Sequence, residues 1–227
     1  GYFKKKKIFY KIAMLKNRLN YDILLNKICV SRETCDLLGV YYDMLISWNK
    51  KINLVSRKSI STSWNRHFLD SAQLWLYLPP KANKWLDFGS GAGFPGLVIA
   101  FISKELKPDL KIVLVEKNKK KAFFLNEVVN KIGLNVEILS NNVESIIPQK
   151  ADVITSRAFG KLDHLLKISY KHQNRDTTAL FPKGVSFTEE IIISKKNWNY
   201  EIEKITNIID NNSFILKIRK LTCARTR

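Results

Sequence analysis

The sequence is poor in cysteine and has no long hydrophobic run. Its 227 residues include three cysteines, with no Cys-x-x-Cys pair and no histidine at ligand spacing. Neither a disulfide framework nor a metal site is therefore predicted, and a reducing compartment is expected. Apolar runs such as residues 96–102 span about seven residues, far short of the roughly 20 needed to cross a bilayer. We therefore expect a soluble protein.

Acidic side chains are also scarce. The chain has 39 lysines and arginines against 20 aspartates and glutamates, which leaves a net charge of +19. With 45% hydrophobic residues it is too apolar to be a disordered basic tail and long enough to bury a core. A basic, folded protein most often binds phosphate groups, so nucleic acid is the first candidate partner and an anionic membrane surface the second.

The basic excess is marked at the N-terminus, where the first 21 residues hold seven basic side chains and no acid. We interpret residues 1–26 as a solvated basic arm. A transit-like leader is the alternative interpretation. The two interpretations correspond to a protein of the bacterial cytoplasm or of an organelle of bacterial origin.

Residues 27–80 are predicted to form a helical cap. Apolar side chains recur at steps of three and four residues from 37 to 48, which is the period of one buried helical face. Ser31 is predicted to cap this helix at its N-terminus. A second helix is expected from about residue 61 to 78 and ends at Pro79 and Pro80, because proline cannot donate to the helical ladder.

Residues 81–220 are predicted to form one α/β domain, followed by a basic tail over residues 221–227. Short apolar runs alternate with helical segments at 119–132 and 162–172. This alternation is typical of a mostly parallel sheet covered on both faces. Residues 200–218 contain two apolar runs without a strong helix between them, which predicts a terminal antiparallel hairpin. The predicted strands are residues 85–87, 112–115, 136–139, 151–155, 178–181 and 214–218.

The most informative segment is a glycine-rich turn, Asp87-Phe-Gly-Ser-Gly-Ala-Gly-Phe-Pro-Gly96, between a strand and a helix. Gly89, Gly91 and Gly93 permit positive φ and a close approach of a ligand to the backbone. Read as G-x-G-x-x-G, the segment also matches a dinucleotide site. Asp87 favours a cationic ligand, because a carboxylate at the strand end neutralises a cation but is unhelpful beside a pyrophosphate.

Acidic positions after the next two strands point to a nucleoside. Glu116 ends the second strand, where a carboxylate can accept hydrogen bonds from both ribose hydroxyls of an adenosine. This feature serves NAD and S-adenosylmethionine equally. Val143 and Glu144 follow the third strand, at the place where such folds usually contact the adenine ring.

Two basic residues are expected at the carboxyl edge of the sheet. Arg157 follows the fourth strand, where it could hold a cofactor carboxylate or an RNA phosphate through its bidentate fork. Lys183 follows the fifth strand, and both are candidates for positioning the substrate. No side chain is assigned as a general acid or base. His67 is expected to make structural hydrogen bonds, and His164 and His172 are expected at the surface.

Together these segments resemble one family, the bacterial small-subunit ribosomal RNA guanine-N7 methyltransferases, also called glucose-inhibited division protein B. The resemblance covers about residues 31–220. One departure is Asn142, where many relatives carry arginine. The segments that carry the resemblance are Trp48-Asn-Lys-Lys-Ile-Asn-Leu-Val-Ser56, Arg66-His-Phe-Leu-Asp-Ser71, the glycine-rich turn, Ser156-Arg-Ala-Phe159 and Lys183-Gly184.

The resemblance implies a Rossmann-like class I S-adenosylmethionine-dependent methyltransferase with a seven-stranded sheet. It implies methylation of guanine N7 in the decoding-region stem of 16S ribosomal RNA, as naked RNA or in the 30S subunit or an assembly intermediate. Guanine N7 carries a free lone pair, so this chemistry needs no general base. A cytoplasmic monomer without metal or membrane partner is expected. Cofactor contacts are implied at Asp87, Gly89, Gly91, Gly93, Phe94, Glu116, Val143, Glu144 and Arg157.

Two other functions are weighed against this one. A nicotinamide-dependent dehydrogenase would use Gly91, Gly93 and Gly96, but fewer than 30 residues separate the fifth apolar run from the terminal hairpin, which leaves little room for a substrate domain. A non-catalytic RNA-binding or ribosome-assembly protein on the same fold would bind RNA without the cofactor. Neither explains the glycine turn together with Asp87 and Arg157 as economically.

Overall fold

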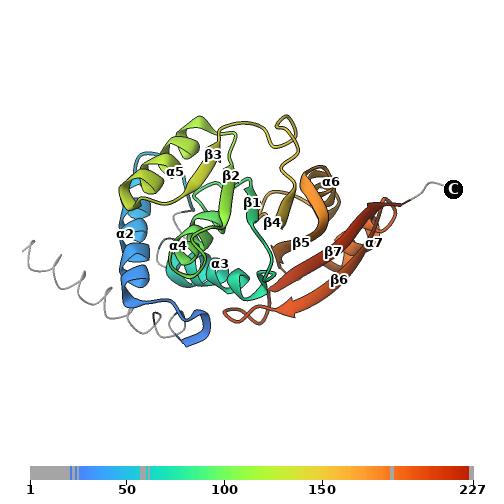
Figure 1. Cartoon of the computed structure of the whole chain (residues 1–227), viewed down its shortest axis with the longest axis horizontal. Coiled ribbons are helices and arrows are strands. Elements are labelled where there is room, and N and C mark those ends of the chain that lie inside the picture. The colour runs from blue at the N-terminus through green and yellow to red at the C-terminus, as the bar shows by residue number, and fades with distance from the viewer. Residues whose placement is uncertain are drawn as a thin grey trace, which may run out of the picture.

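Seven strands form one sheet in the order β3-β2-β1-β4-β5-β7-β6 in the computed structural model of the chain (Figure 1). The structure describes residues 21, 24, 26–56, 60, 62–184 and 187–224. Most of the arm predicted over residues 1–26 and the end of the predicted tail, residues 225–227, therefore lie outside the described residues.

The first five strands run parallel, β7 pairs antiparallel with β5, and β6 pairs antiparallel with β7. β1 is central, and Asp87 on it stands in register with Leu114 of β2 and Thr155 of β4. This topology confirms the predicted mostly parallel sheet with a terminal hairpin. The strands are β1 (Lys84–Phe88), β2 (Lys111–Val115), β3 (Val136–Leu139), β4 (Ala151–Thr155), β5 (Gln173–Lys183), β6 (Trp198–Thr206) and β7 (Phe214–Cys223).

Helices bury both faces of the sheet. α2 (Arg32–Asn49), α4 (Gly96–Leu106) and α5 (Lys119–Ile132) share one apolar core with one set of strand side chains. α6 (Leu162–His172) and α7 (Phe187–Ser194) share a second core with the alternate set. Two apolar faces explain why the strands are near-continuous hydrophobic runs rather than alternating ones. The sequence-based prediction omitted α7.

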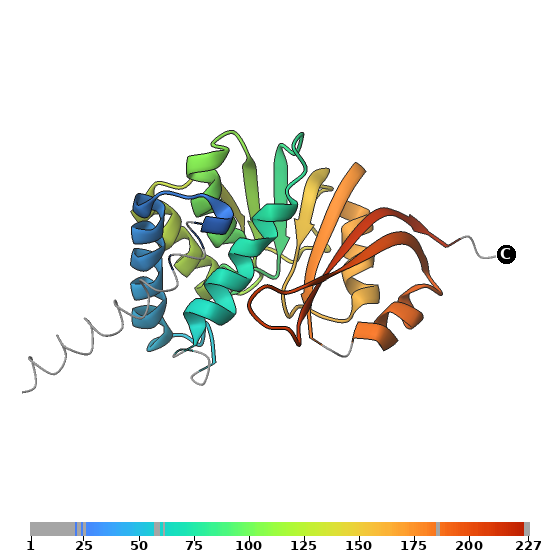
Figure 2. The same ribbon diagram turned by 90° about the horizontal axis from the view of Figure 1, so that it is seen from below.

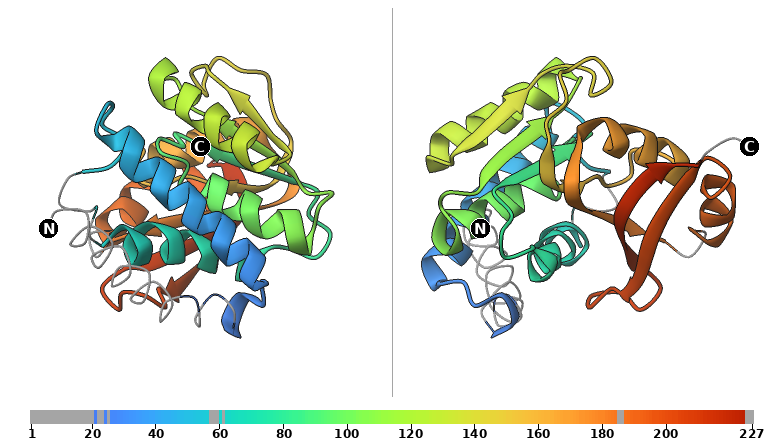
Figure 3. Two further views of the ribbon diagram at one scale, coloured as in Figure 1. Left: turned by 90° about the vertical axis from the view of Figure 1, so that its left-hand side faces the viewer. Right: turned by 45° about the vertical axis from the view of Figure 1, so that its right-hand side comes forward.

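The predicted cap is helical. Ser31 is the N-cap of α2, and its hydroxyl accepts a hydrogen bond from the Thr34 amide at 3.3 Å. Glu105, at the end of α4, accepts hydrogen bonds from the Ser31 amide and the Thr34 hydroxyl, which ties the start of α2 to α4. In Figure 3, α2 lies across α4 and α5. The second helical segment comprises η2 (Trp64–Leu69), α3 (Asp70–Ala72) and η3 (Gln73–Tyr77) and ends just before Pro79.

The terminal hairpin reaches back to the cap. The loop after β6 contacts the second helical segment, where the Asn207 side chain donates to Asp70 Oδ1 at 2.5 Å and the Ile208 amide donates to Gln73 Oε1 at 3.1 Å. The rest of the hairpin extends away from α2, at the other end of the molecule (Figure 2). β7 continues to Cys223, so it includes the first residues of the segment predicted as a tail.

His172 corrects the prediction that it lies at the surface. It ends α6 and is fully buried, with Nε2 3.0 Å from the Val143 carbonyl and Nδ1 accepting from the Gln149 amide at 3.2 Å. The backbone of the β3–β4 connection supplies both partners, and no local sequence pattern encodes such a contact. In the described part of the chain, no helix is both long and apolar enough to span a membrane.

Candidate cofactor and substrate site

The glycine turn between β1 and α4 is shaped by close contacts that exclude side chains. Gly89 has φ +66°, and a Cβ there would lie 2.1 Å from the Phe159 ring. A Cβ on Gly96 would lie 2.2 Å from Leu114 and 2.8 Å from Asp87 Oδ2. The Tyr41 hydroxyl of α2 donates to the Ala92 carbonyl at 2.5 Å, so the cap supports the turn from behind. The turn thus presents bare backbone to the carboxyl edge of the sheet.

Asp87 lies beneath this turn, fully buried. Its Oδ1 accepts from the Thr155 hydroxyl at 2.8 Å, and its Oδ2 accepts from the Gly96 amide at 3.3 Å. Thr155 in turn accepts from the Trp85 indole at 2.9 Å. Burial raises the pKa of Asp87 to about 6, against the lowering effect of these hydrogen bonds. Asp87 therefore holds the turn from below and does not line the cavities described next.

The first cavity, of about 210 Å³, opens beside the turn. Glu116 is buried at its wall, where Oε2 accepts from the Gly91 amide at 2.8 Å and Oε1 accepts from the Asn118 amide at 2.7 Å. These two hydrogen bonds, to the glycine turn and to Asn118, the N-cap residue of α5, fix the orientation of the carboxylate. The lining residues are Gly89, Gly91, Val115, Glu116, Lys117, Lys121, Asn141, Asn142, Val143, Ala158 and Phe159.

Four of the predicted cofactor residues line this cavity: Gly89, Gly91, Glu116 and Val143. Sequence reasoning assigned no ligand contact to Lys117, Lys121, Asn141, Ala158 or Phe159. The Ser156-Arg-Ala-Phe159 segment could have identified Ala158 and Phe159, because it follows β4 at the carboxyl edge of the sheet. Asn142 also lines the cavity, and its side chain accepts from the Glu144 amide at 3.2 Å. The Glu144 side chain instead pairs with His164 at 4.0 Å.

A second cavity, of about 450 Å³, lies on the other side of Ala158, which lines both. Its lining residues come from the cap, from the ends of β4 and β5, and from the loop of the hairpin. Arg157 and Lys183 both line it, so the structure brings the two predicted positioning residues together. The other lining residues are Asn65, Arg66, His67, Asp70, Pro182, Gly184, Asn207, Ile209, Asp210 and Ser213.

Arg157 is held by the cap. Its Nη1 donates to the Arg66 carbonyl at 2.9 Å and lies 3.5 Å from Asp70 Oδ2. The guanidinium stands 5.1 Å from the centroid of Phe94, a buried aromatic of the glycine turn. Burial lowers the pKa of Arg157, and the Asp70 carboxylate opposes that shift. Burial raises the pKa of Asp70, and Arg157 opposes it in turn. Arg157 thereby joins the cap, the turn and the second cavity.

Lys183 is also engaged within the protein. Its ammonium donates to Glu190 Oε2 at 2.7 Å and to the Gly160 carbonyl at 2.8 Å. His67, in contrast, corrects the expectation of structural hydrogen bonds: both ring nitrogens are buried without a partner among the described residues. The ring packs 5.1 Å from Phe94, and burial lowers the pKa of His67 to about 4. It is therefore a neutral packing residue at pH 7.

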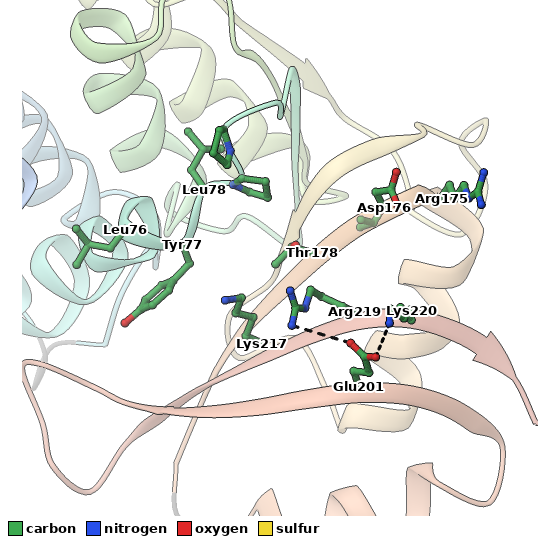
Figure 4. Close-up of a pocket in the computed structure, with 13 residues that line it drawn as sticks. Leu76, Tyr77, Leu78, Arg175, Asp176, Thr178, Glu201, Lys217, Arg219 and Lys220 are labelled. Atoms are coloured by element: carbon green, nitrogen blue, oxygen red, sulfur yellow. Dashed lines mark hydrogen bonds and ion pairs between the residues drawn. The ribbon is translucent and has the colours of Figure 1, made fainter.

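A third cavity, of about 590 Å³, lies toward the amino ends of the strands (Figure 4). Residues 76–80, before β1, and residues 175–178, in the first half of β5, form part of its lining. Tyr77 faces Lys217 across it, while Glu201 pairs with Lys220 at 2.6 Å and with Arg219 at 4.0 Å. It lacks the glycine turn and lies away from the carboxyl edge where open α/β folds bind ligands.

The sheet order, the glycine turn after β1 and the acidic residue after β2 define the class I S-adenosylmethionine-dependent methyltransferase fold. Solved structures agree. A SAM-dependent methyltransferase from Aquifex aeolicus superposes with a TM-score of 0.54 at 17% identity, covering 70% of this chain and 92% of that one. M. jannaschii TYW2, in complex with AdoMet, gives a TM-score of 0.51 at 15% identity, covering 77% and 80%.

Sequence comparison identifies the family within this class. The family model described as rRNA small subunit methyltransferase G matches residues 34–214. The ribosomal RNA small subunit methyltransferase G of Cereibacter sphaeroides is 39% identical over 200 residues, covering 88% of this chain and 97% of that protein. Its counterpart from a Ruegeria species is 40% identical over 190 residues, covering 84% and 92%. The chain belongs to the rRNA small subunit methyltransferase G family.

Proposed function

We propose that the protein transfers a methyl group from S-adenosylmethionine to N7 of one guanosine in the decoding-region stem of 16S ribosomal RNA. One observation carries this proposal: two cavities meet at Ala158, one beside the glycine turn and one lined by Arg157 and Lys183. A methyl donor in the first and a nucleobase in the second would face each other across that residue. The family membership supports the substrate class.

The first cavity suits the cofactor. Gly89 and Gly91 line it with backbone atoms, and the Phe159 ring packs so closely on Gly89 that no residue with a Cβ fits there. Glu116 has a fixed carboxylate at the wall, in position for ribose hydroxyls, and Val143 offers an apolar contact for the adenine ring. Asp87, Gly93, Phe94, Glu144 and Arg157 do not line this cavity, and we assign them to hold the turn and the cavity edge around the same ligand.

The second cavity suits a base that needs no deprotonation. When bound, S-adenosylmethionine supplies an electrophilic methyl group on a cationic sulfur. The N7 lone pair forms the new bond as the carbon–sulfur bond breaks, and the positive charge passes to the guanine, so no general base is required. Asp70 is occupied by Arg157, Gln73 and Asn207, and His67 has no hydrogen-bond partner among the described residues and is neutral at pH 7. We therefore assign to the lining of this cavity the positioning of the base rather than proton transfer.

The target must leave a regular helix to reach this cavity. N7 lies in the deep, narrow major groove of A-form RNA, which side chains cannot enter. The guanosine is therefore flipped out, or the enzyme acts before the stem has closed. The +19 charge supplies affinity for the RNA backbone without sequence specificity, and binding weakens as salt rises.

The test is transfer of labelled methyl from S-adenosylmethionine to unmodified 16S ribosomal RNA and to 30S particles, followed by chemical mapping of 7-methylguanosine. We expect one labelled guanosine, and we expect Arg157→Ala to reduce the labelling. Cofactor binding without labelling of either substrate would show that the substrate assignment is wrong. Failure to bind the cofactor would favour a non-catalytic RNA-binding protein.

A further inference from the structure

An exposed aromatic side chain on α5 lines neither of the two cavities. Phe123 is 56% exposed, although its neighbour Phe124 is fully buried in the core. Its ring lies 5.8 Å from Trp48, at the end of α2, with an angle of 54° between the planes. Trp48 is itself only partly buried. Two adjoining aromatic rings at the surface offer a face on which an unstacked base can pack.

Lysines surround these rings. Lys119 and Lys120 precede Phe123 by four and three residues on α5, which places all three on one helical face. Lys51 stands over the Trp48 ring at 5.8 Å. In the described part of the chain, none of these three lysines forms an ion pair. An unpaired cluster of like charges repels itself, so a polyanion bound there stabilises it.

Along the chain this surface lies next to residues that line the cofactor cavity. Lys117 and Lys121, which flank Lys119 and Lys120 in the sequence, line that cavity. The first turn of α5 therefore has cations both at the cavity mouth and on the outer surface. The third cavity also carries cations, but Glu201 and Glu203 pair with three of them. The unpaired cations at the carboxyl edge are the ones best placed for an RNA that inserts a base into the site.

We propose that the surface formed by Trp48, Lys51, Lys119, Lys120 and Phe123, the α5 platform, binds the substrate RNA beside the target guanosine. The lysines contact backbone phosphates, and an unpaired base next to the target packs on Phe123. The combination of cations and aromatic rings fits single-stranded RNA, in which both phosphate and base are accessible. This inference rests on the proposed function, because it assumes that ribosomal RNA is the substrate.

Charge reversal tests the lysine contacts. The Lys119→Glu/Lys120→Glu variant is compared with Lys195→Glu/Lys196→Glu, which changes the same charge at an exposed lysine pair beyond α7, at the other end of the molecule (Figure 1). Affinity for unmodified 16S RNA is measured across a salt series. We expect the first variant to lower the slope of log affinity against log salt by about 1.4 to 1.8, as for two lost phosphate contacts. An equal effect of both variants would overturn the proposal.

Removal of the aromatic ring tests the stacking contact. Phe123→Ala is expected to raise the KM for RNA about tenfold, with unchanged affinity for S-adenosylmethionine, whereas Phe123→Trp retains the wild-type KM. An unchanged KM in Phe123→Ala would contradict the base contact. If the variants weaken binding to the 30S particle but not to protein-free RNA, the platform contacts a ribosomal protein and the RNA assignment is wrong. If the wild type labels neither substrate, the proposed function itself fails.

Discussion

The carboxylate of Asp70 lies 3.5 Å from the guanidinium of Arg157, across a sequence separation of 87 residues. The same carboxylate accepts from Asn207, in the hairpin loop, at 2.5 Å. One side chain of the cap thus joins the β4 end to the terminal hairpin around the second cavity. This contact, together with its place after β4, holds the guanidinium of Arg157 at the second cavity.

Asp70→Asn is expected to weaken both the fold and the site. The asparagine keeps the shape of the side chain but removes the charge that faces the partly buried Arg157. We expect a loss of about 1–3 kcal/mol in the free energy of unfolding, measured by urea denaturation, and a lower kcat/KM for RNA. Asp109→Asn, at an exposed aspartate between α4 and β2, serves as a control for the loss of one carboxylate. Retention of both stability and activity in Asp70→Asn would contradict the assigned role.

Asp87→Asn is expected to change how stability depends on pH. Because the folded pKa of Asp87 is raised from 3.8 to about 6, the folded protein binds the proton more tightly than the unfolded chain does. The contribution of Asp87 to the free energy of unfolding therefore falls as pH rises from about 4 to 6, by roughly 3 kcal/mol in total. The variant removes this contribution. The difference in unfolding free energy between the wild type and the variant should therefore change between pH 4 and pH 7. A difference that does not change with pH would refute the raised pKa of Asp87.

Gly89→Ala is expected to weaken cofactor binding. A methyl group there collides with Phe159, and a positive φ alone costs about 1–2 kcal/mol in a residue with a Cβ. Gly133→Ala separates the two effects, because Gly133 also has positive φ, +69°, but no atom within 4 Å of the added Cβ. Isothermal titration with S-adenosylmethionine should show at least roughly tenfold weaker binding for Gly89→Ala. Binding by Gly133→Ala should equal that of the wild type.

Glu116→Gln is expected to weaken cofactor binding without unfolding the protein. The amide retains the size of the side chain but loses the charge that accepts from Gly91 and would accept from the ribose. Hydrogen bonds to a charged group contribute about 1.5–3 kcal/mol, so affinity should fall roughly 10–100-fold. The control is Glu127→Gln, on α5, the helix that follows Glu116 in the chain. Equal affinity in Glu116→Gln and the wild type would place the ribose elsewhere.

Much of the fold was predictable because it follows from local patterns. The apolar runs identified the sheet strands, and the period of the flanking segments identified α5 and α6 at their observed bounds. Ser31 was recognisable as an N-cap from residue type and position. The short helix α7 was missed because the run of isoleucines within it has no helical period. It packs against α6, and that contact is not local.

The sequence by itself determined where ligand chemistry is possible: a glycine turn after β1, an acid after β2 and an arginine after β4. Parallel strands bring their carboxyl ends to one edge, so these positions converge in any such fold. Only the tertiary structure decided what each side chain does there. It placed Asp87 beneath the turn, paired Arg157 with Asp70, buried His172 and set Trp48 beside Phe123. These contacts depend on how the cap and the hairpin pack against the sheet, and packing between distant segments leaves no periodic signal in the chain.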